Sequence, residues 1–270
     1  NIDQEFVQNL GQQFGLPVSV RKVDIPAIRK EMRVGEEEAA RVVRYRCLEE
    51  IAREVGAGKI AVGHTADDRA ESVLLNIIRG TGVDGLGSIM PVRGNIVRPL
   101  IETTRKEIEE YIALNRLPYR VDESNMDVTY ARNRIRHELL PLLERDYNPR
   151  IRRALINLAD IAAAESEYLS DSVASAVRGG LREGALDAGL LNLPTAVQRR
   201  VVRAEIERLK GDLNDLSFQQ VERVVEALHT GGDFTITLPS GGLFAPRSGD
   251  RFEVRRQISV PTIEHFEIEM

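Results

Sequence analysis

The chain has 270 residues, of which 42% are hydrophobic and 29% charged, and its formal net charge is −5. This length can bury one sizeable core and a smaller second one, so two domains are expected. No apolar run approaches the ~20 residues that span a bilayer, and the N-terminal residues do not resemble a signal peptide, which predicts a cytoplasmic protein without a membrane partner.

Helical and strand patterns alternate along the first half of the chain, which is typical of a parallel α/β sheet. The run 59–63 is short and apolar, which favours a strand buried on both faces. The spacing of Thr65 and Asp68 predicts a capping box at a helix start. The elements are predicted in the order helix 2–14, strand 17–23, helix 36–55, strand 59–63, helix 66–79, strand 96–98 and a helix from 105 to about 115 whose Ile108, Tyr111 and Ile112 face inward.

The second half reads as a long connector followed by a small α+β unit. The predicted elements are an alanine-rich helix from 150 to about 177, helices 193–209 and 217–228, and a hairpin of strands 234–238 and 252–254. The predicted organisation is an α/β domain over 1–147, a helical linker over 148–184, a small α+β domain over 185–257 and a tail over 258–270.

Three carboxylates and a histidine follow the strand at 59–63, where an α/β sheet places its chemistry. His64 closes the strand, and Asp67, Asp68 and Glu71 lie in the first turns of the next helix. A single acid there complements the helix dipole, but three in five residues repel one another unless a metal ion or an ammonium lies among them. The pattern therefore favours a functional cluster, with Asp68 and Glu71 on one edge of the helix.

Arginines concentrate between residues 130 and 153, where seven stand against three acids. Arginine suits bidentate contact with phosphate, so the segment is a candidate nucleic-acid surface, although a solvated helix face explains the charge equally well. Cys47 is the single cysteine of the sequence, which excludes a disulfide within residues 1–270. It lies in the apolar stripe of helix 36–55, so it is predicted to be a core residue. The histidines show no ligand spacing, so a metal site built on histidine is not expected.

Six sequence blocks stand in the order and spacing of one family. They are 37–45, 63–71, 79–82 with 85–86, 98–100, 122–125 and 132–136. Through these blocks the chain resembles the tRNA isoleucine-lysidine synthetases from residue 1 to about 255. The resemblance implies a truncated Rossmann-like parallel sheet of the N-type ATP pyrophosphatase kind, followed by a linker helix and a small α+β C-terminal domain.

Members of this family hold the ATP phosphates in a Ser-Gly-Gly-x-Asp-Ser loop after their first strand. No such loop occurs in residues 1–270, and the Ser-Gly-Gly at 240–242 lacks the Asp-Ser and is predicted to be a hairpin turn. The chain is therefore expected to start inside the catalytic domain and to be inactive alone.

The resemblance implies a two-step ligation that uses ATP and Mg²⁺. ATP adenylates the 2-carbonyl oxygen of the wobble cytidine in an isoleucine tRNA with a CAU anticodon, and the ε-amine of free lysine then displaces AMP. Asp68 and Glu71 would bind the lysine ammonium and take its proton, while Arg44 and Arg136 would stabilise charge on the α-phosphate. A homodimer is left open.

The remaining candidates carry more than one interpretation. His64 would touch phosphate or only close the strand, Asp67 would bind Mg²⁺ with ATP or cap its helix, and Arg41 is grouped with them as a phosphate contact. The residues expected to grip tRNA are Arg132, Asn133, Arg152, Arg153, Arg199, Arg200 and Arg203, with Asn133 also expected to cap a helix. Two alternatives remain: a tRNA thiolation enzyme, which normally needs several cysteines, and a non-catalytic tRNA-binding remnant, which would not keep three carboxylates.

Overall fold

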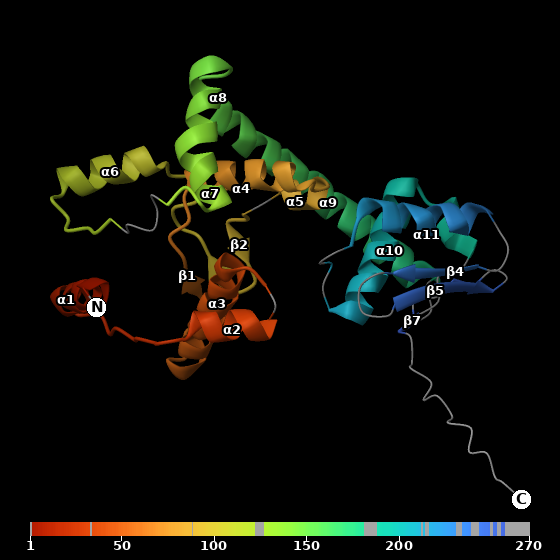
Figure 1. Ribbon diagram of the computed structural model, residues 1–270, viewed down its shortest axis with the longest axis horizontal. Coiled ribbons are helices and arrows are strands. Elements are labelled where there is room, and N and C mark those ends of the chain that lie inside the picture. Colours follow the sequence, from red (N-terminus) through yellow and green to blue (C-terminus); the bar gives the residue numbers. More distant parts are fainter. Residues whose placement is uncertain are drawn as a thin grey trace, which may run out of the picture. The chain divides into compact units, whose positions relative to one another are not determined.

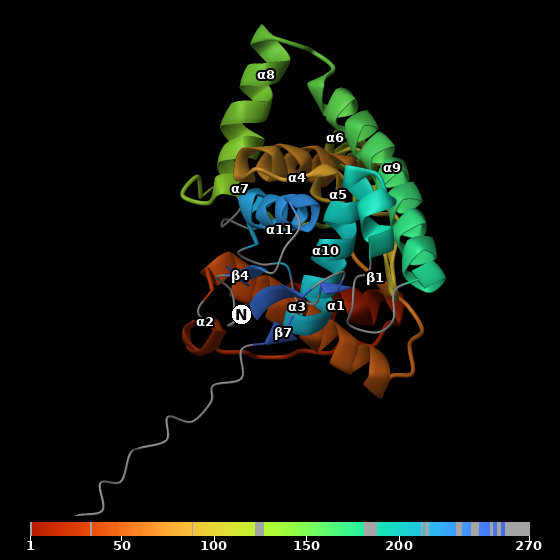
Figure 2. The ribbon, with the colours of Figure 1, turned by 90° about the vertical axis from the view of Figure 1, so that its right-hand side faces the viewer.

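The computed structural model divides the chain into two compact units, Asn1–Ala163 and Ala164–Met270, which are described separately (Figures 1 and 2). It describes all residues except 1, 33, 88, 122–126, 181–187, 212, 214–215, 231–233, 239–242, 249–250, 253–254 and 257–270. Helix α9 (Ile151–Gly180) runs through the boundary between the units. Among the described helices, none combines the length and the apolar character needed to cross a membrane.

Unit 1 consists of helices around a small mixed sheet. The sheet has the order β1-β3-β2, with β1 (Ile60–Ala61) parallel to β3 (Ile96–Val97) and β2 (Val92–Arg93) antiparallel to β3. The helices before α9 are α1 (Ile2–Phe14), α2 (Ile25–Met32), α3 (Glu36–Glu54), α4 (Ala66–Arg79), α5 (Val83–Leu86), α6 (Arg105–Leu114), α7 (Ala131–Arg134), the π-helical turn η2 (Ile135–Leu139) and α8 (Leu140–Asp146).

Helix α4 follows directly from β1 and carries the predicted acidic cluster. Thr65 is its N-cap, and reciprocal hydrogen bonds between Thr65 and Asp68 form the predicted capping box. Gly80 ends the helix in the left-handed conformation with φ of 79°, which a residue without Cβ adopts at little cost. The apolar face of α4 packs against η2, α8 and α9 in a core of Ala66, Ala70, Val73, Leu74, Ile135, Leu140, Leu155, Ile156 and Ala159.

Unit 2 is a small α+β unit. Its elements after α9 are the 3-10 helix η3 (Ala188–Asn192), α10 (Thr195–Lys210), α11 (Phe218–Thr230), β4 (Phe234–Leu238), β5 (Leu243–Ser248), β6 (Arg251–Phe252) and β7 (Arg255–Arg256). Its core is formed by the facing apolar sides of α10 and α11, with Val173 from α9 and Leu190 from η3.

The α/β class and the predicted helices are confirmed, and β1, β3 and β4 lie where strands were expected. The sheet of unit 1 is mixed and not parallel throughout as predicted, because β2 pairs with β3 in the antiparallel direction. The predicted strand at 17–23 is wrong, because residues 16–24 belong to neither a helix nor a strand. A Cβ on Gly11 would lie 2.3 Å from Val18 Cγ2, so this segment packs closely against α1 instead of pairing with a strand. Val20 and Val23, whose alternation suggested a strand, are exposed.

The predicted pairing of strand 234–238 with 252–254 is also wrong. The partner of β4 is β5, in a register that runs from Phe234 opposite Arg247 to Leu238 opposite Leu243. Pro246 lies within β5 and obscures its strand pattern, since proline is unusual inside a strand. The predicted turn at 240–242 lies outside the described residues.

Three burial predictions need correction. Strand β1 buries Ile60 but exposes Ala61, so it is not buried on both faces. Tyr111 is 62% exposed because α6 lies at the surface of the unit and buries none of its residues. Cys47 is only half-buried, since the stripe it belongs to runs from buried Val43 to exposed Val55 along α3.

Candidate active site

The capping box at the start of α4 fixes the carboxylate of Asp68. Its Oδ2 accepts hydrogen bonds from the Thr65 amide at 2.8 Å and from Thr65 Oγ1 at 2.9 Å. This leaves Oδ1 for other partners, and it accepts from Arg132 Nη2 at 3.0 Å and Arg136 Nη2 at 3.2 Å. Asp68 is therefore held by its own helix on one side and by two guanidinium groups on the other.

Glu71 lies one turn further along α4 and is completely buried. Arg136 forms a bidentate pair with it, with Nε 2.6 Å from Oε1 and Nη2 2.9 Å from Oε2. Arg132 adds a third contact, with Nε 3.0 Å from Oε2. The positive charge that two neighbouring carboxylates require is thus supplied by the chain itself, in the fork geometry that makes such pairs strong.

The two arginines come from α7 and the π-helical turn η2, which continue into α8. Short π-helical turns occur frequently at functional sites. The prediction that Asn133 caps a helix is wrong, because Tyr130 is the N-cap of α7 and Asn133 lies inside it. The Asn133 side chain donates instead to the carbonyl of Asp127 at 2.8 Å, so it braces the chain that leads into α7.

Charge and burial oppose each other at this cluster. Burial favours the neutral form of Asp68, but the Thr65 hydrogen bonds and the nearby Arg132 and Arg136 outweigh it and hold the pKa of Asp68 below its ordinary value. The hydrogen bond to Glu71 raises the pKa of Arg136. Both carboxylate and guanidinium are therefore charged at neutral pH.

Asp67 belongs to a different network from Asp68 and Glu71. Its Oδ2 accepts from the backbone amide of Arg105 at the start of α6, and its Oδ1 accepts from Arg152 of α9, both at 2.7 Å. Arg152 is in turn held by Glu144 at 2.8 Å. Asp67 therefore connects three helices of unit 1, and the predicted triple cluster consists of one carboxylate pair and one separate carboxylate.

A pocket of about 580 Å³ lies beside the carboxylate pair, with Arg132 in its wall. Five arginines line it, against two glutamates, Glu37 and Glu38. The arginines are Arg41, Arg79, Arg93, Arg98 and Arg132. This excess of positive charge suits an anionic ligand with several phosphate groups.

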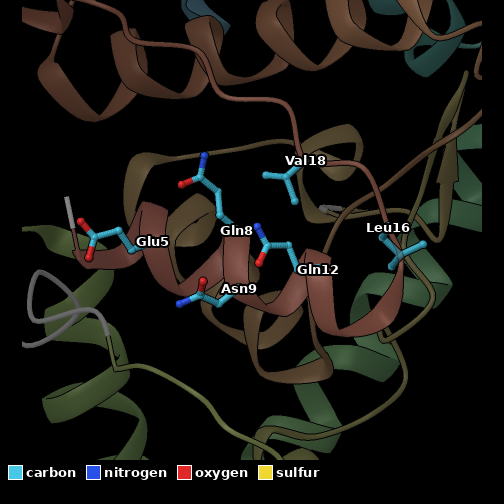
Figure 3. Close-up of a pocket in the computed structure, with 6 residues that line it drawn as sticks. All are labelled: Glu5, Gln8, Asn9, Gln12, Leu16 and Val18. Atoms are coloured by element: carbon cyan, nitrogen blue, oxygen red, sulfur yellow. The ribbon is translucent and has the colours of Figure 1, made fainter.

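A second hollow lies along α1 and differs in character (Figure 3). Its lining is mainly uncharged, and Gln8 and Gln12 extend from α1 toward Val18 (Figure 3). Glu5 is the charged residue among those that line it. It therefore offers no positive charge to a polyanion.

His64 and Arg98 meet in the wall of the arginine-lined pocket. The Arg98 Nε lies 3.3 Å from His64 Nδ1, so Nδ1 accepts and the ring proton is on Nε2. Burial is the largest cause that lowers the pKa of His64, and the charges of Arg98, Arg132 and Arg44 lower it further against the opposing effect of Asp68. His64 is therefore a neutral donor at physiological pH.

The other predicted residues of unit 1 are dispersed. Arg44 is exposed on α3 and has no hydrogen-bonded or ion-paired partner among the described residues. Arg41 is paired with Glu38 at 2.8 and 3.0 Å and borders the pocket. Arg153 is exposed and, within the described part of the chain, carries no ion pair.

In unit 2, the three predicted arginines lie on α10. Arg199 forms a bidentate pair with Glu222 at 2.6 and 2.8 Å and lies over the Phe218 ring. Arg200 donates to the hydroxyls of Ser166 and Ser170 on α9. Arg203 is half-buried.

Arg98 belongs to this site although no role was assigned to it from the sequence, and the same holds for Arg79 and Arg93 of the pocket lining. Arg98 follows β3, which is parallel to β1, so the chain places it beside His64 at the same edge of the sheet. The position of an arginine directly after a predicted strand was the available signal, because parallel strands present their carboxyl ends together. The block at 122–125 lies outside the described residues.

The fold and the arginine-lined pocket fit an ATP-binding protein of the PP-loop class, and the PP-loop domain family matches residues 1–143. The TilS substrate binding domain matches residues 188–256. The chain belongs to the tRNA(Ile)-lysidine synthase family. The tRNA(Ile)-lysidine synthase of Caldanaerobacter subterraneus is 39% identical over 243 residues, which cover 88% of this chain and 52% of that protein.

The tRNA(Ile)-lysidine synthase of Thermosynechococcus vestitus is 37% identical over 245 residues, which cover 87% of this chain and 68% of that protein. A U34-tRNA thiolase from Methanococcus maripaludis superposes with a TM-score of 0.48 at 16% identity, over 59% of this chain and 55% of that one. The chain spans 51–58% of the length of three of the synthases that it matches.

Proposed function

We propose that this protein ligates lysine to the wobble cytidine of an isoleucine tRNA with a CAU anticodon, by way of an adenylated tRNA. In the first step, the 2-carbonyl oxygen of the cytidine attacks the α-phosphorus of ATP and pyrophosphate leaves. In the second step, the ε-amine of lysine attacks the activated carbon, a proton leaves the amine, and AMP departs. Family membership and the carboxylate pair beside an arginine-lined pocket support this proposal.

Asp68 and Glu71 are the proposed partners of the lysine amine, as an anionic contact and as proton acceptor. Both are already bound to Arg132 and Arg136, so the ammonium must share or exchange these partners. An exchange has a clear driving force, because guanidinium groups that leave the carboxylates can move to phosphate charge. The proposed role of Arg136 in adenyl transfer rests on this exchange.

Arg44 is the second proposed contact for the charge that builds up on the α-phosphate. It stands on the long helix α3, carries no ion pair among the described residues and is close enough to lower the pKa of His64. His64 and Arg41, which line the pocket, are proposed phosphate contacts.

Mg²⁺ is proposed to arrive bound to the ATP phosphates, with water molecules among its other ligands. Among the described residues, no group of three or more His, Cys, Asp or Glu side chains is placed to hold a metal ion. Asp67 fits the role of a metal ligand poorly, since Arg152 and the Arg105 amide already occupy both of its oxygens.

The proposed tRNA contacts differ in how readily they can reach phosphate. Arg153 is exposed and without an ion pair in the described structure, whereas Arg152 and Arg199 are held by carboxylates. Arg203 is supported by its place on α10, and Arg132 by its place in the pocket wall. Asn133 and Arg200 remain proposals from the resemblance, as do cytoplasmic location and a homodimer.

The test is lysine-dependent AMP release with a CAU-anticodon isoleucine tRNA, measured on the protein as its gene encodes it. The expected product is lysidine in the tRNA, detected by nucleoside mass spectrometry. Thiolated nucleoside in place of lysidine would identify a thiolation enzyme. Tight tRNA binding without AMP release from the gene product would identify a non-catalytic binder.

Glu71→Gln and Asp68→Asn are expected to raise the apparent KM for lysine at least about tenfold, since each removes a charged partner of the ammonium. Glu138→Gln, an exposed change in the same region, is the matched control. An unchanged lysine KM in both cluster variants would contradict the assigned role.

A further inference from the structure

Arg98 is a buried charge, with 8% of its surface exposed, at the carboxyl end of β3. Its Nη1 donates to the carbonyl of Met90 at 2.6 Å and its Nε donates to His64 Nδ1 at 3.3 Å. Both acceptors are neutral. Among the described residues, no carboxylate forms an ion pair with Arg98, in contrast to Arg132, Arg136 and Arg152.

A buried guanidinium without a counter-ion is unfavourable, because the lost hydration is not repaid by an opposite charge. The Nη2 of Arg98 has no acceptor among the described residues. In this part of the chain, the fully buried side-chain nitrogen that lacks a hydrogen-bond partner belongs to Arg69, so Nη2 of Arg98 is not fully buried. Nη2 is therefore open to solvent, and Arg98 lines the arginine-rich pocket. Its unused donors face a space that a ligand can enter.

The neighbouring groups point to the charge of that ligand. His64 presents its Nε2 proton as a second donor, since Nδ1 is occupied by Arg98. Arg79 and Arg93 share the same lining and form no ion pair with another described residue, whereas Arg41 and Arg132 are paired with carboxylates. Glu38 is the partner of Arg41, which leaves Glu37 as the unpaired carboxylate among the described residues of this lining. Donors and positive charge thus exceed acceptors around Arg98, which favours an anion.

We propose that Arg98, with His64 beside it, forms an anion subsite of this pocket that binds a phosphoryl oxygen. This inference rests on the proposed function for its two sources of phosphate, which are ATP and the tRNA backbone. Arg98 acts as the ligand's counter-ion, and its Nη2, together with the N–H of Nη1 that does not bond to Met90, suits one phosphoryl group. His64 donates to the same group or to its neighbour.

Isothermal titration calorimetry on residues 1–270 tests the subsite with two probes: ATP, and an RNA anticodon stem-loop with the CAU sequence. Arg98→Met removes the charge at similar length, Arg98→Lys keeps the charge without the fork, and Arg53→Met removes an exposed arginine of α3 as the control. Both Arg98 variants are expected to bind at least one probe about tenfold or more weakly, and the control to bind normally. The affected probe identifies the source of the phosphate.

Thermal unfolding without ligand is the second readout. Arg98→Met is expected to melt no earlier than the unaltered chain, because it removes an uncompensated buried charge. Unchanged affinity of Arg98→Met for both probes, or no binding of either probe to the unaltered chain, would overturn the proposal. So would a large drop in midpoint that Arg98→Lys restores with unchanged affinity, since that result defines a structural arginine.

The subsite and the enzymatic function fail separately. Arg98-dependent binding without lysidine formation by the gene product keeps the subsite and removes the function. Lysidine formation with binding that does not depend on Arg98 keeps the function and removes the subsite.

Discussion

The pairing of Glu71 with two arginines makes a quantitative prediction about the stability of unit 1. Glu71→Gln keeps the size of the side chain but removes its charge, and it replaces an acceptor-only group with one that carries an NH₂ donor. Three charge-assisted hydrogen bonds of 2.6, 2.9 and 3.0 Å are lost or weakened. Arg132 and Arg136 are then left partly buried with Asp68 as their remaining carboxylate.

The expected cost follows from that remaining carboxylate. Removing one partner of a buried ion pair destabilises by about 3–5 kcal/mol, and the contacts of Asp68 at 3.0 and 3.2 Å place the expected loss at the lower end, about 3 kcal/mol. For a unit of this size, that loss lowers the melting midpoint by roughly 6–12 °C.

The assay is differential scanning calorimetry, because the two compact units are expected to contribute separately. The transition of unit 1 should shift and that of unit 2 should stay. Glu138→Gln, which is exposed and outside the cluster, is expected to stay within about 0.5 kcal/mol of the unaltered chain. A Glu71→Gln protein that melts with its control would refute the argument that these arginines depend on Glu71.

Three further predictions concern charge. Because the pKa of Asp68 is lowered in the folded state, its contribution to stability is complete above its unfolded-state pKa of about 4 and is lost as the pH falls through the lower folded-state value. The urea midpoint should therefore fall in that acid range, and Asp68→Asn should make its dependence on pH less steep. The same dependence on pH in the variant and the unaltered chain would contradict this role of Asp68. Arg44→Lys and Arg136→Lys should each slow single-turnover adenylation by about 10²-fold in the gene product, with only Arg136→Lys also melting early; early melting with a normal rate would make either arginine structural. Replacing Arg152 and Arg153 together with alanine should reduce the slope of log K for tRNA binding against log salt by about two units if both contact phosphate. A reduction of about one unit in this double variant would mean that only Arg153 contacts phosphate and that Arg152 stays with its carboxylates.

Local signals in the sequence determined where α4 and α6 begin and where α4 ends. The capping boxes at Thr65 and Thr104 join residues three positions apart, so their hydrogen bonds form with little dependence on the rest of the chain. The same holds for the glycine that ends α4 in the left-handed conformation. The position of Asp68 and Glu71 on one edge of that helix also follows from helical periodicity alone.

Strand pairing was decided by the tertiary structure. The alternation at 17–23 has the pattern of a strand, but a strand requires a partner, and this segment packs against α1. Conversely, β5 pairs with β4 because the two segments are adjacent in the chain, although β5 contains Pro246, which lies opposite Thr235. Pairing depends on which backbone is available, and periodicity does not report that.

The tertiary structure also decided how the charges are partnered. Asp67 and Asp68 are neighbours in sequence, yet Asp67 binds Arg152, which is 85 positions away, while Asp68 binds Arg132, which is 64 away. The sequence predicted that a cation must lie among the carboxylates, and the fold supplies arginines from α7, η2 and α9 for that purpose. Residue type determines that opposite charges must meet, but only the packing of distant helices determines which ones do, and it leaves Arg98 buried without a carboxylate partner among the described residues.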